Sequence, residues 1–233
     1  MLAGHFTTAL IAKQHAPSAP IAYFLVASQL PDLLWLVFHY AGLEPTGPDN
    51  FMEVSLDTME ATMTYSHDLL PTLGWIALTV LVGRALSGAW RPGLFGGAIV
   101  VVHALTDYLG GYPHHVFGPD SHAVGTGMYY SSPYLAVSLE LLFIVVTMAW
   151  VVHTDRRAGV RRSSGTWRAW AAVFGGGIAF LYASADISLV ELLGIEAPTS
   201  LSGSTVPVLG GTYVAMLLAL WWADGRPTQT QTS

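Results

Sequence analysis

The chain has 233 residues, of which 52% are hydrophobic and only 10% are charged. Soluble domains carry about a quarter charged residues, so this composition excludes an ordinary soluble protein and predicts an integral membrane protein. Cysteine is absent, which excludes a disulfide framework and a thiolate metal site, so any metal would be held by His, Asp and Glu. The formal net charge of −6 is informative only through its distribution along the chain. No nucleic-acid partner is expected.

The apolar segments follow one another as expected helices. The first covers residues 2–15 and ends before Pro17 and Pro20, and the second covers 21–42 with an interruption at Pro31-Asp32. After a polar loop over 44–66, further helices are expected over 69–86, 94–109, 134–152, 167–189 and 206–222. About 20 helical residues cross a bilayer. The sequence therefore predicts an all-α polytopic transmembrane helix bundle in one domain, residues 1–225, followed by a polar disordered tail over 226–233.

The number of spans depends on the first helix, which is short for a full crossing. If it crosses, there are seven spans; if it is only peripheral, there are six. In the polar loop, apolar residues recur at helical spacing over residues 49–63, and Asp49 or Asn50 could cap such a helix. We expect this segment to be a short helix lying on the outer surface of the membrane.

The basic residues indicate an orientation. All nine fall at alternate ends of the expected helices: Lys13, Arg84, Arg91, Arg156, Arg157, Arg161, Arg162, Arg168 and Arg226. The opposite loops carry acidic residues instead: Glu44, Asp49, Glu53, Asp57, Glu60, Asp120, Glu191 and Glu196. By the positive-inside rule, the Arg-rich segment 154–168 faces the cytoplasm and the acidic loops face outside. The expected location is the cytoplasmic (inner) membrane, in a multi-pass arrangement.

Ionisable residues inside the apolar segments all fall toward the outer ends of these helices. An ionisable group within a membrane costs several kcal/mol and is usually functional. Helices that are distant in sequence therefore bring such groups to one level and predict a site facing outside; the groups are His5, Asp32, His67, His103, Asp107, Glu140 and Asp186.

His103 and Asp107 are four residues apart, so they share one helix face and can reach the same ion. The alternative is a hydrogen-bonded structural pair. His67 is not a favoured helix cap, which points to a ligand role, whereas the neighbouring Asp68 is better read as a cap. Asp32 follows a proline that exposes backbone, which indicates either a site or a kink capped by Asp32.

Other histidines are open to two interpretations. His5 lies near the start of the chain, where a histidine is usually solvent-exposed. His114, His115 and His122 lie in the expected outer loop over 110–133, where they either assist the site or are solvated.

The order of these motifs resembles a broad group of bacterial inner-membrane proteins described as membrane-bound metal-dependent hydrolases, with a distant relation to zinc-dependent phospholipase C. The resemblance covers about residues 1–145 and rests on Gly4-His5-Phe6, Leu30-Pro31-Asp32, Tyr65-Ser66-His67, His103-x-x-x-Asp107, Tyr130-Ser131-Ser132-Pro133 and Ser138-Leu139-Glu140-Leu141. It implies that five residues are metal ligands or their immediate neighbours: His5, Asp32, His67, His103 and Asp107. The chain departs from the group at Asp68, where a second Ser or Thr is frequent, and over residues 110–115.

The leading hypothesis is a membrane-embedded metal-dependent hydrolase with its site at the outer leaflet. A set of His and carboxylate ligands suits zinc, with Mn²⁺ and Fe²⁺ as alternatives. Asp32 or Glu140 would accept the proton of the attacking water. The resemblance further implies a lipid-linked phosphoester as the substrate, reached from the lipid bilayer. The alternatives are a transporter or permease for a metal or small solute, and a non-enzymatic membrane scaffold.

Overall fold

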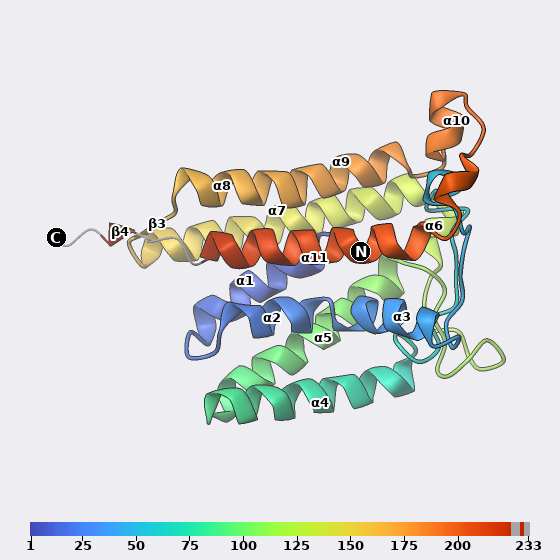
Figure 1. Ribbon diagram of the computed structural model, residues 1–233. Helices are drawn as coiled ribbons and strands as arrows, with labels where there is room; N and C mark the ends of the chain where they lie inside the picture. The colour runs from blue at the N-terminus through green and yellow to red at the C-terminus, as the bar shows by residue number, and fades with distance from the viewer. Residues whose placement is uncertain (225–228, 231–233) are drawn as a thin grey trace.

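The computed structural model describes residues 1–224 and 229–230, in which helices lie side by side with most of their axes close to parallel (Figure 1). The helices are α1 (His5–His15), α2 (Ile21–Ser28), α3 (Leu30–Tyr40), α4 (Leu69–Ser87), α5 (Trp90–Gly110), α6 (Met128–Ser131), α7 (Pro133–Arg157), α8 (Ser164–Trp170), α9 (Gly176–Ala183), α10 (Leu189–Leu193) and α11 (Thr205–Asp224). Shorter turns are the 3-10 segments η1 (Phe51–Glu53) and η3 (Thr199–Leu201) and the π-helical η2 (Ala171–Gly175). Two antiparallel pairs of very short strands join β1 (Thr46–Gly47) to β2 (Glu60–Ala61), and β3 (Val160–Arg161) to β4 (Gln229–Thr230).

The length and composition of its helices indicate a membrane protein. Within the described residues, four helices are long and apolar enough to cross a bilayer: α4, α5, α7 and α11. The pair α2 and α3 adds a fifth candidate if it is one span bent by 63° at Gln29. The prediction of six to seven spans is therefore not confirmed. The segment expected over 167–189 is divided into α8, η2 and α9, and α1 has only 11 residues.

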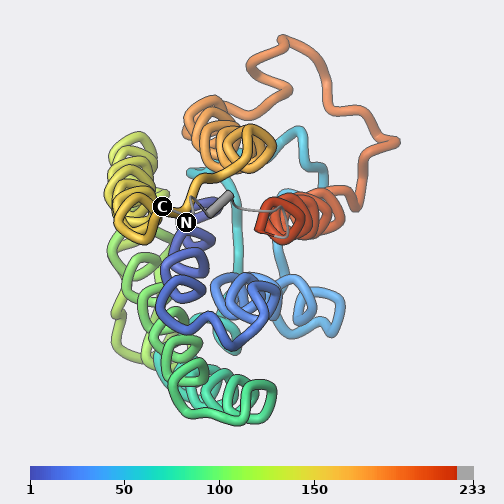
Figure 2. The backbone as a smooth tube through the Cα atoms, turned by 90° about the vertical axis from the view of Figure 1, so that its left-hand side faces the viewer, coloured from blue at the N-terminus to red at the C-terminus, as the bar shows by residue number. Residues whose placement is uncertain are grey.

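Helix α1 is neither a clear span nor a peripheral helix, because it is buried in the bundle. Figure 2, which views the helices end-on, shows it enclosed by neighbouring helices, and it packs against α2, α5 and α7. The hydroxyl groups of Thr7 and Thr8 donate to the carbonyl oxygens of Gly4 and His5, at 2.7 and 2.6 Å. These bonds satisfy polar groups that would otherwise face apolar neighbours.

Close packing of α4 on α5 fixes the helix that carries His103 and Asp107. A Cβ atom added at Gly97 would lie only 2.6 Å from Cγ2 of Val80, so a larger residue here would have to displace that side chain. The Tyr23 hydroxyl reaches across from α2 and donates to the Thr79 carbonyl at 2.8 Å. The glycine pair at 96–97 thus marks close helix contact, as small residues usually do in membranes.

The two ends of the bundle differ in chemistry. The basic end carries the Lys and Arg residues that the structure describes, at the α1–α2 turn, the α4–α5 turn and the α7–α8 junction; Arg226 lies outside the described residues. The opposite end, which we call the loop end, is formed by the long connections over residues 41–68, 111–132 and 184–204 (Figure 1). The described Lys and Arg residues are therefore gathered at one end of the bundle, as the sequence predicted, and Asp155 and Asp224 pair with Arg162 there.

The segment over residues 49–63 corrects an expectation. It is not one amphipathic surface helix but a folded connection that contains η1 and β2. Asn50 does cap, since its side chain accepts from the Met52 backbone N–H at 3.1 Å. Met59 and Met63 are buried, so apolar side chains at helical spacing here cover the interior of the protein instead of facing lipid. The predicted tail over 226–233 lies outside the described residues except for β4.

Candidate metal centre

Four buried side chains meet near the loop end: Asp32, His67, His103 and Asp107. Asp32 lies in the first turn of α3, just after the break from α2, and His67 immediately precedes α4. His103 and Asp107 lie one turn apart near the end of α5. One potential ligand atom from each residue falls within 4.8 Å of all the others. The predicted convergence of His67, His103 and Asp107, with Asp32 beside them, is thus confirmed.

The ligand atoms of this group face a common point, and one pair among them, His67 Nε2 and Asp32 Oδ1, is a hydrogen bond. Asp107 Oδ2 lies 3.1 Å from His103 Nε2 and 3.8 Å from His67 Nε2, and Asp32 Oδ1 lies 3.3 Å from His67 Nε2. Despite its short distance to Asp107, His103 Nε2 does not have the geometry of a hydrogen bond, and Asp32 Oδ2 has no hydrogen-bond partner among the described residues. Buried polar atoms normally find partners, so these unpaired atoms fit a set of donors for a shared cation.

The other nitrogen of each histidine is held by a neighbour. His103 Nδ1 lies 2.8 Å from the carbonyl oxygen of Ser28, the last residue of α2. A carbonyl only accepts, so Nδ1 carries the proton and Nε2 presents its lone pair to the centre of the group. His67 Nδ1 also has a partner, the Ser66 hydroxyl at 2.7 Å; because a hydroxyl can donate or accept, this contact holds the ring without fixing its tautomer. Such outer contacts orient histidine ligands in metal sites.

His5 lies beside this group instead of within it. Its ring stacks on that of His103, with centroids 3.7 Å apart, and its Nε2 lies 3.2 Å from Asp107 Oδ1. The amino group of Met1 also bonds Asp107 Oδ1. His5 is buried, which removes the interpretation of a solvated terminal histidine. Of the two roles implied for His5, the geometry favours an immediate neighbour that orients Asp107.

Glu140, from α7, is occupied by backbone groups. Its Oε1 accepts from the N–H groups of Ala3 and Gly4 at 2.8 and 2.9 Å, and its Oε2 accepts from that of Leu2 at 3.2 Å. The carboxylate therefore holds the turn that precedes α1 and carries His5. Its predicted role as a proton acceptor stays a prediction, and we interpret Glu140 as a positioning residue.

Loop residues around the centre have separate roles. Asp68 stands at the start of α4, but its carboxylate accepts from the backbone N–H groups of His115 and Gly118, at 2.8 and 2.6 Å, and so fixes the loop over 111–127.

His114 is buried and stacks on His67, with ring centroids 5.3 Å apart. Burial, together with the nearby His67, lowers the pKa of His114 to about 3, so this ring is neutral. By contrast, His122 is exposed.

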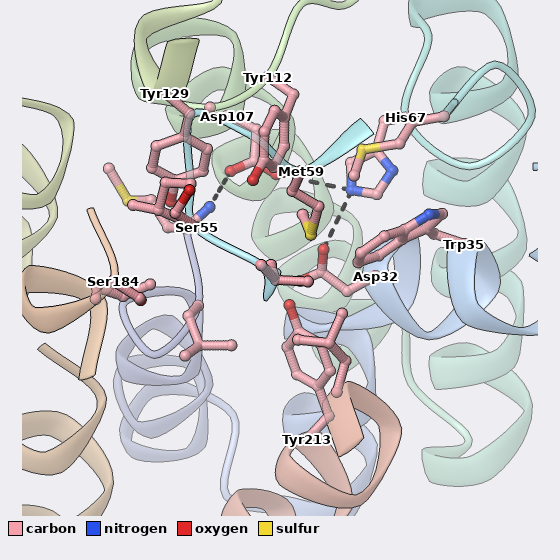
Figure 3. A pocket seen from close by; sticks show the side chains of 18 of the residues that line it. Asp32, Trp35, Ser55, Met59, His67, Asp107, Tyr112, Tyr129, Ser184 and Tyr213 are labelled. Atoms are coloured by element: carbon pink, nitrogen blue, oxygen red, sulfur yellow. Dashed lines mark hydrogen bonds and ion pairs between the residues drawn. The ribbon is translucent and has the colours of Figure 1, made fainter. Parts of the chain in front are cut away.

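A cavity of about 80 Å³ adjoins the metal group. Asp32, His67 and Asp107 form part of its wall, and Figure 3 shows them facing the same space. Most of the remaining lining is apolar and comes from η1, the connection over 54–63, α9 and α11. Three tyrosines also line it: Tyr112, Tyr129 and Tyr213. Nothing in the sequence singles out these tyrosines, because only the folded chain brings their segments together.

No protein-family model, curated protein or solved structure matches the chain. The resemblance to membrane-bound metal-dependent hydrolases thus stays a prediction.

Proposed function

We propose that this protein is a membrane-embedded metal-dependent hydrolase. The observation that carries the proposal is the convergence of four buried ligand side chains, with unpaired atoms among them, beside a mainly apolar cavity. Two histidines and one carboxylate suit a catalytic zinc ion, which keeps its fourth position open for water. An ion held there would polarise the scissile group and lower the pKa of a bound water to about 7.

Different residues of the chain would bind the ion, orient its ligands and accept the proton. His67, His103 and Asp107 would hold the ion, with the histidines oriented by Ser66 and Ser28. Asp32 approaches from α3 with its Oδ2 unpartnered, so it is placed to accept the proton of the attacking water. The hydroxide left by the water then bonds to the substrate at the scissile ester. Asp32 passes the proton to the leaving oxygen as the ester bond breaks.

The cavity supports a lipid-like substrate. Residues such as Phe51, Leu56 and Phe180 give it a mainly apolar wall, while the metal group supplies its polar part. An amphiphile can therefore place an ester at Asp32 and Asp107 and an alkyl chain against the apolar wall. A lipid-linked phosphoester is the substrate class that we propose.

The break between α2 and α3 favours one alternative, a transporter for a metal or small solute. Broken helices with charged residues at the break are common at transporter sites. The hydrolase and transporter hypotheses differ in whether an ester is hydrolysed, because a transporter binds the ion reversibly and moves it without hydrolysing an ester.

The hydrolase proposal is tested with the Asp32→Asn variant. It is expected to bind zinc at close to the wild-type level but to hydrolyse bis(p-nitrophenyl) phosphate roughly 100-fold or more slowly, because a general base typically contributes a factor of 10² to 10⁴. Zinc content and initial rates are measured on the same detergent-purified samples, with and without chelator.

Asp120→Asn is the matched control, since Asp120 is exposed in the loop end, and it should behave as the wild type. Zinc-loaded wild-type protein that moves zinc across a vesicle membrane, and hydrolyses neither this diester nor p-nitrophenyl butyrate, would count for the transporter instead.

The basic end is proposed to face the cytoplasm, which places the metal group toward the outside of the inner membrane. The chain has no cysteine, so single cysteines report orientation cleanly. Asp120→Cys, at the loop end, should react with a membrane-impermeant maleimide on intact cells. Ala158→Cys, at the basic end, should react only after permeabilisation; both positions are exposed. Labelling of Ala158→Cys on intact cells would reverse the proposed orientation.

A further inference from the structure

Three buried hydroxyl groups in the cavity have no use within the protein. Tyr112, Tyr129 and Tyr213 are each only 5% exposed and line the cavity beside the metal group. The Tyr112 hydroxyl is fully buried and has no hydrogen-bond partner among the described residues. The hydroxyls of Tyr129 and Tyr213 make no hydrogen bond within the described part of the chain either, and they open onto the cavity. Figure 3 shows the Tyr213 hydroxyl directed toward Asp32, with Tyr112 and Tyr129 in the part of the cavity that holds Asp107.

Five of the other seven tyrosines use their hydroxyls within the protein, and the remaining two, Tyr40 and Tyr65, are exposed. The hydroxyls of Tyr23, Tyr108 and Tyr130 donate to backbone carbonyl oxygens, at 2.8, 2.9 and 2.9 Å. Those of Tyr134 and Tyr182 pair with Asp186 and Ser138, at 2.7 and 2.6 Å. A buried hydroxyl usually finds a partner. Three unpaired hydroxyls around one cavity therefore indicate donors kept for a ligand.

The charged groups around the cavity limit the charge that this ligand can carry. Asp32 and Asp107 contribute two negative charges, and the Met1 amino group, which also lines the cavity and bonds Asp107, contributes one positive charge. With one divalent ion bound, the net charge of these groups would be +1, which one monoanion balances. Within the described part of the chain, no Lys or Arg side chain lines the cavity. Neutral phenol groups cannot balance a dianion, and burying an unbalanced charge is costly. A group with at most one negative charge is thus favoured over a phosphomonoester, which is dianionic at neutral pH.

The number of hydrogen-bond donors in the cavity narrows the class of ligand further. A carboxylic ester has two oxygen atoms, so after one oxygen meets the ion most of the tyrosine hydroxyls would stay unpaired. A phosphodiester has four oxygen atoms and a single negative charge. It can offer one oxygen to the ion and others to the three hydroxyls, so it satisfies both the charge and the hydrogen-bond count.

We infer that Tyr112, Tyr129 and Tyr213 form a subsite that binds the oxygens of a phosphodiester headgroup and discriminates against phosphomonoesters. The inference rests on the proposed function, because it assigns the specificity of the same site. The apolar wall, including Met59, Leu181 and Leu209, then contacts the alkyl part of the ligand.

The test measures binding of two unreactive probes, dihexyl phosphate with one charge and monohexyl phosphate with two at about pH 8. Calorimetry uses the full chain in lipid nanodiscs, with empty nanodiscs as the blank, in the presence and absence of zinc. Wild-type protein should bind dihexyl phosphate at least about ten-fold more tightly than monohexyl phosphate. Each single Tyr→Phe change should weaken dihexyl phosphate binding roughly ten-fold or more, as expected for one hydrogen bond to an anionic group.

Tyr134→Phe is the matched control, since that hydroxyl bonds Asp186 outside the cavity, and it should bind the probes as the wild type does. Binding of neither probe, equal binding of the two, or Phe variants of the three cavity tyrosines that bind like the wild type would overturn the inference. No turnover is required. Protein that binds dihexyl phosphate through these tyrosines but hydrolyses nothing would leave the subsite standing and count against the hydrolase.

Discussion

Replacing Asp107 with asparagine is expected to lower the zinc affinity of the protein by about 100-fold or more while the chain still inserts and folds. Asp107 Oδ2 lies 3.1 Å from His103 Nε2 and 3.8 Å from His67 Nε2, so this carboxylate is central to the group. Even residues that only support a metal ligand change affinity by roughly 10- to 100-fold when they are replaced. Asparagine keeps the shape of the side chain and removes only its anionic oxygen.

A structural pair of His103 and Asp107 would behave otherwise. Asparagine would then keep a neutral hydrogen bond, and such bonds inside membranes average only about 0.6 kcal/mol. The two cases are separated by metal analysis of purified protein and by the melting temperature with added zinc or chelator. The metal hypothesis predicts that zinc raises the melting temperature of the wild type and not that of Asp107→Asn, because a ligand that binds only the folded state stabilises it.

Controls for this experiment come from two further positions. His103→Ala removes a second ligand and should lose zinc in the same way. Asp186→Asn removes a carboxylate that only accepts a bond from the Tyr134 hydroxyl, and it should keep the wild-type zinc content. Wild-type protein that purifies without metal and melts at the same temperature in zinc and in chelator would eliminate the hydrolase proposal.

Local sequence rules were enough to find much of the candidate site. The spacing of His103 and Asp107 fixes their shared face through helix geometry alone. Pro31 marked the break that places Asp32, and the alternation of basic and acidic loops placed all of these groups at one level. These inferences succeed because each rests on a single element or on the order of elements along the membrane axis.

Contacts between distant segments could not be read in the same way. The periodic apolar residues over 49–63 fit a surface helix equally well, and only the fold shows Met59 and Met63 turned inward. The sequence could not show that α1 is buried inside the bundle, since the burial of an 11-residue helix depends on its neighbours α2, α5 and α7. The three cavity tyrosines come from a loop, α6 and α11, whose juxtaposition leaves no local pattern.

Glu140 provides the clearest case of such a distant contact, and Glu140→Ala is expected to destabilise the protein by about 3 to 5 kcal/mol. The change leaves the backbone N–H groups of Leu2, Ala3 and Gly4 without their acceptor inside an apolar bundle. Each unsatisfied buried donor costs about 1 to 3 kcal/mol, and the costs are not fully additive. For a chain of this length the melting temperature should fall by about 10 °C.

Glu140→Gln separates this positioning role from the proton-accepting role that the sequence predicted. One amide oxygen can replace Oε1, which serves both Ala3 and Gly4, whereas the amide NH₂ faces the N–H of Leu2 in place of Oε2. The expected loss of stability is therefore smaller, about 1 to 2 kcal/mol. Turnover of bis(p-nitrophenyl) phosphate should stay within about ten-fold of the wild type if Glu140 only holds the turn before α1. A general base would instead show a loss of roughly 10² to 10⁴ in turnover with the melting temperature little changed, and that result would return Glu140 to the catalytic group.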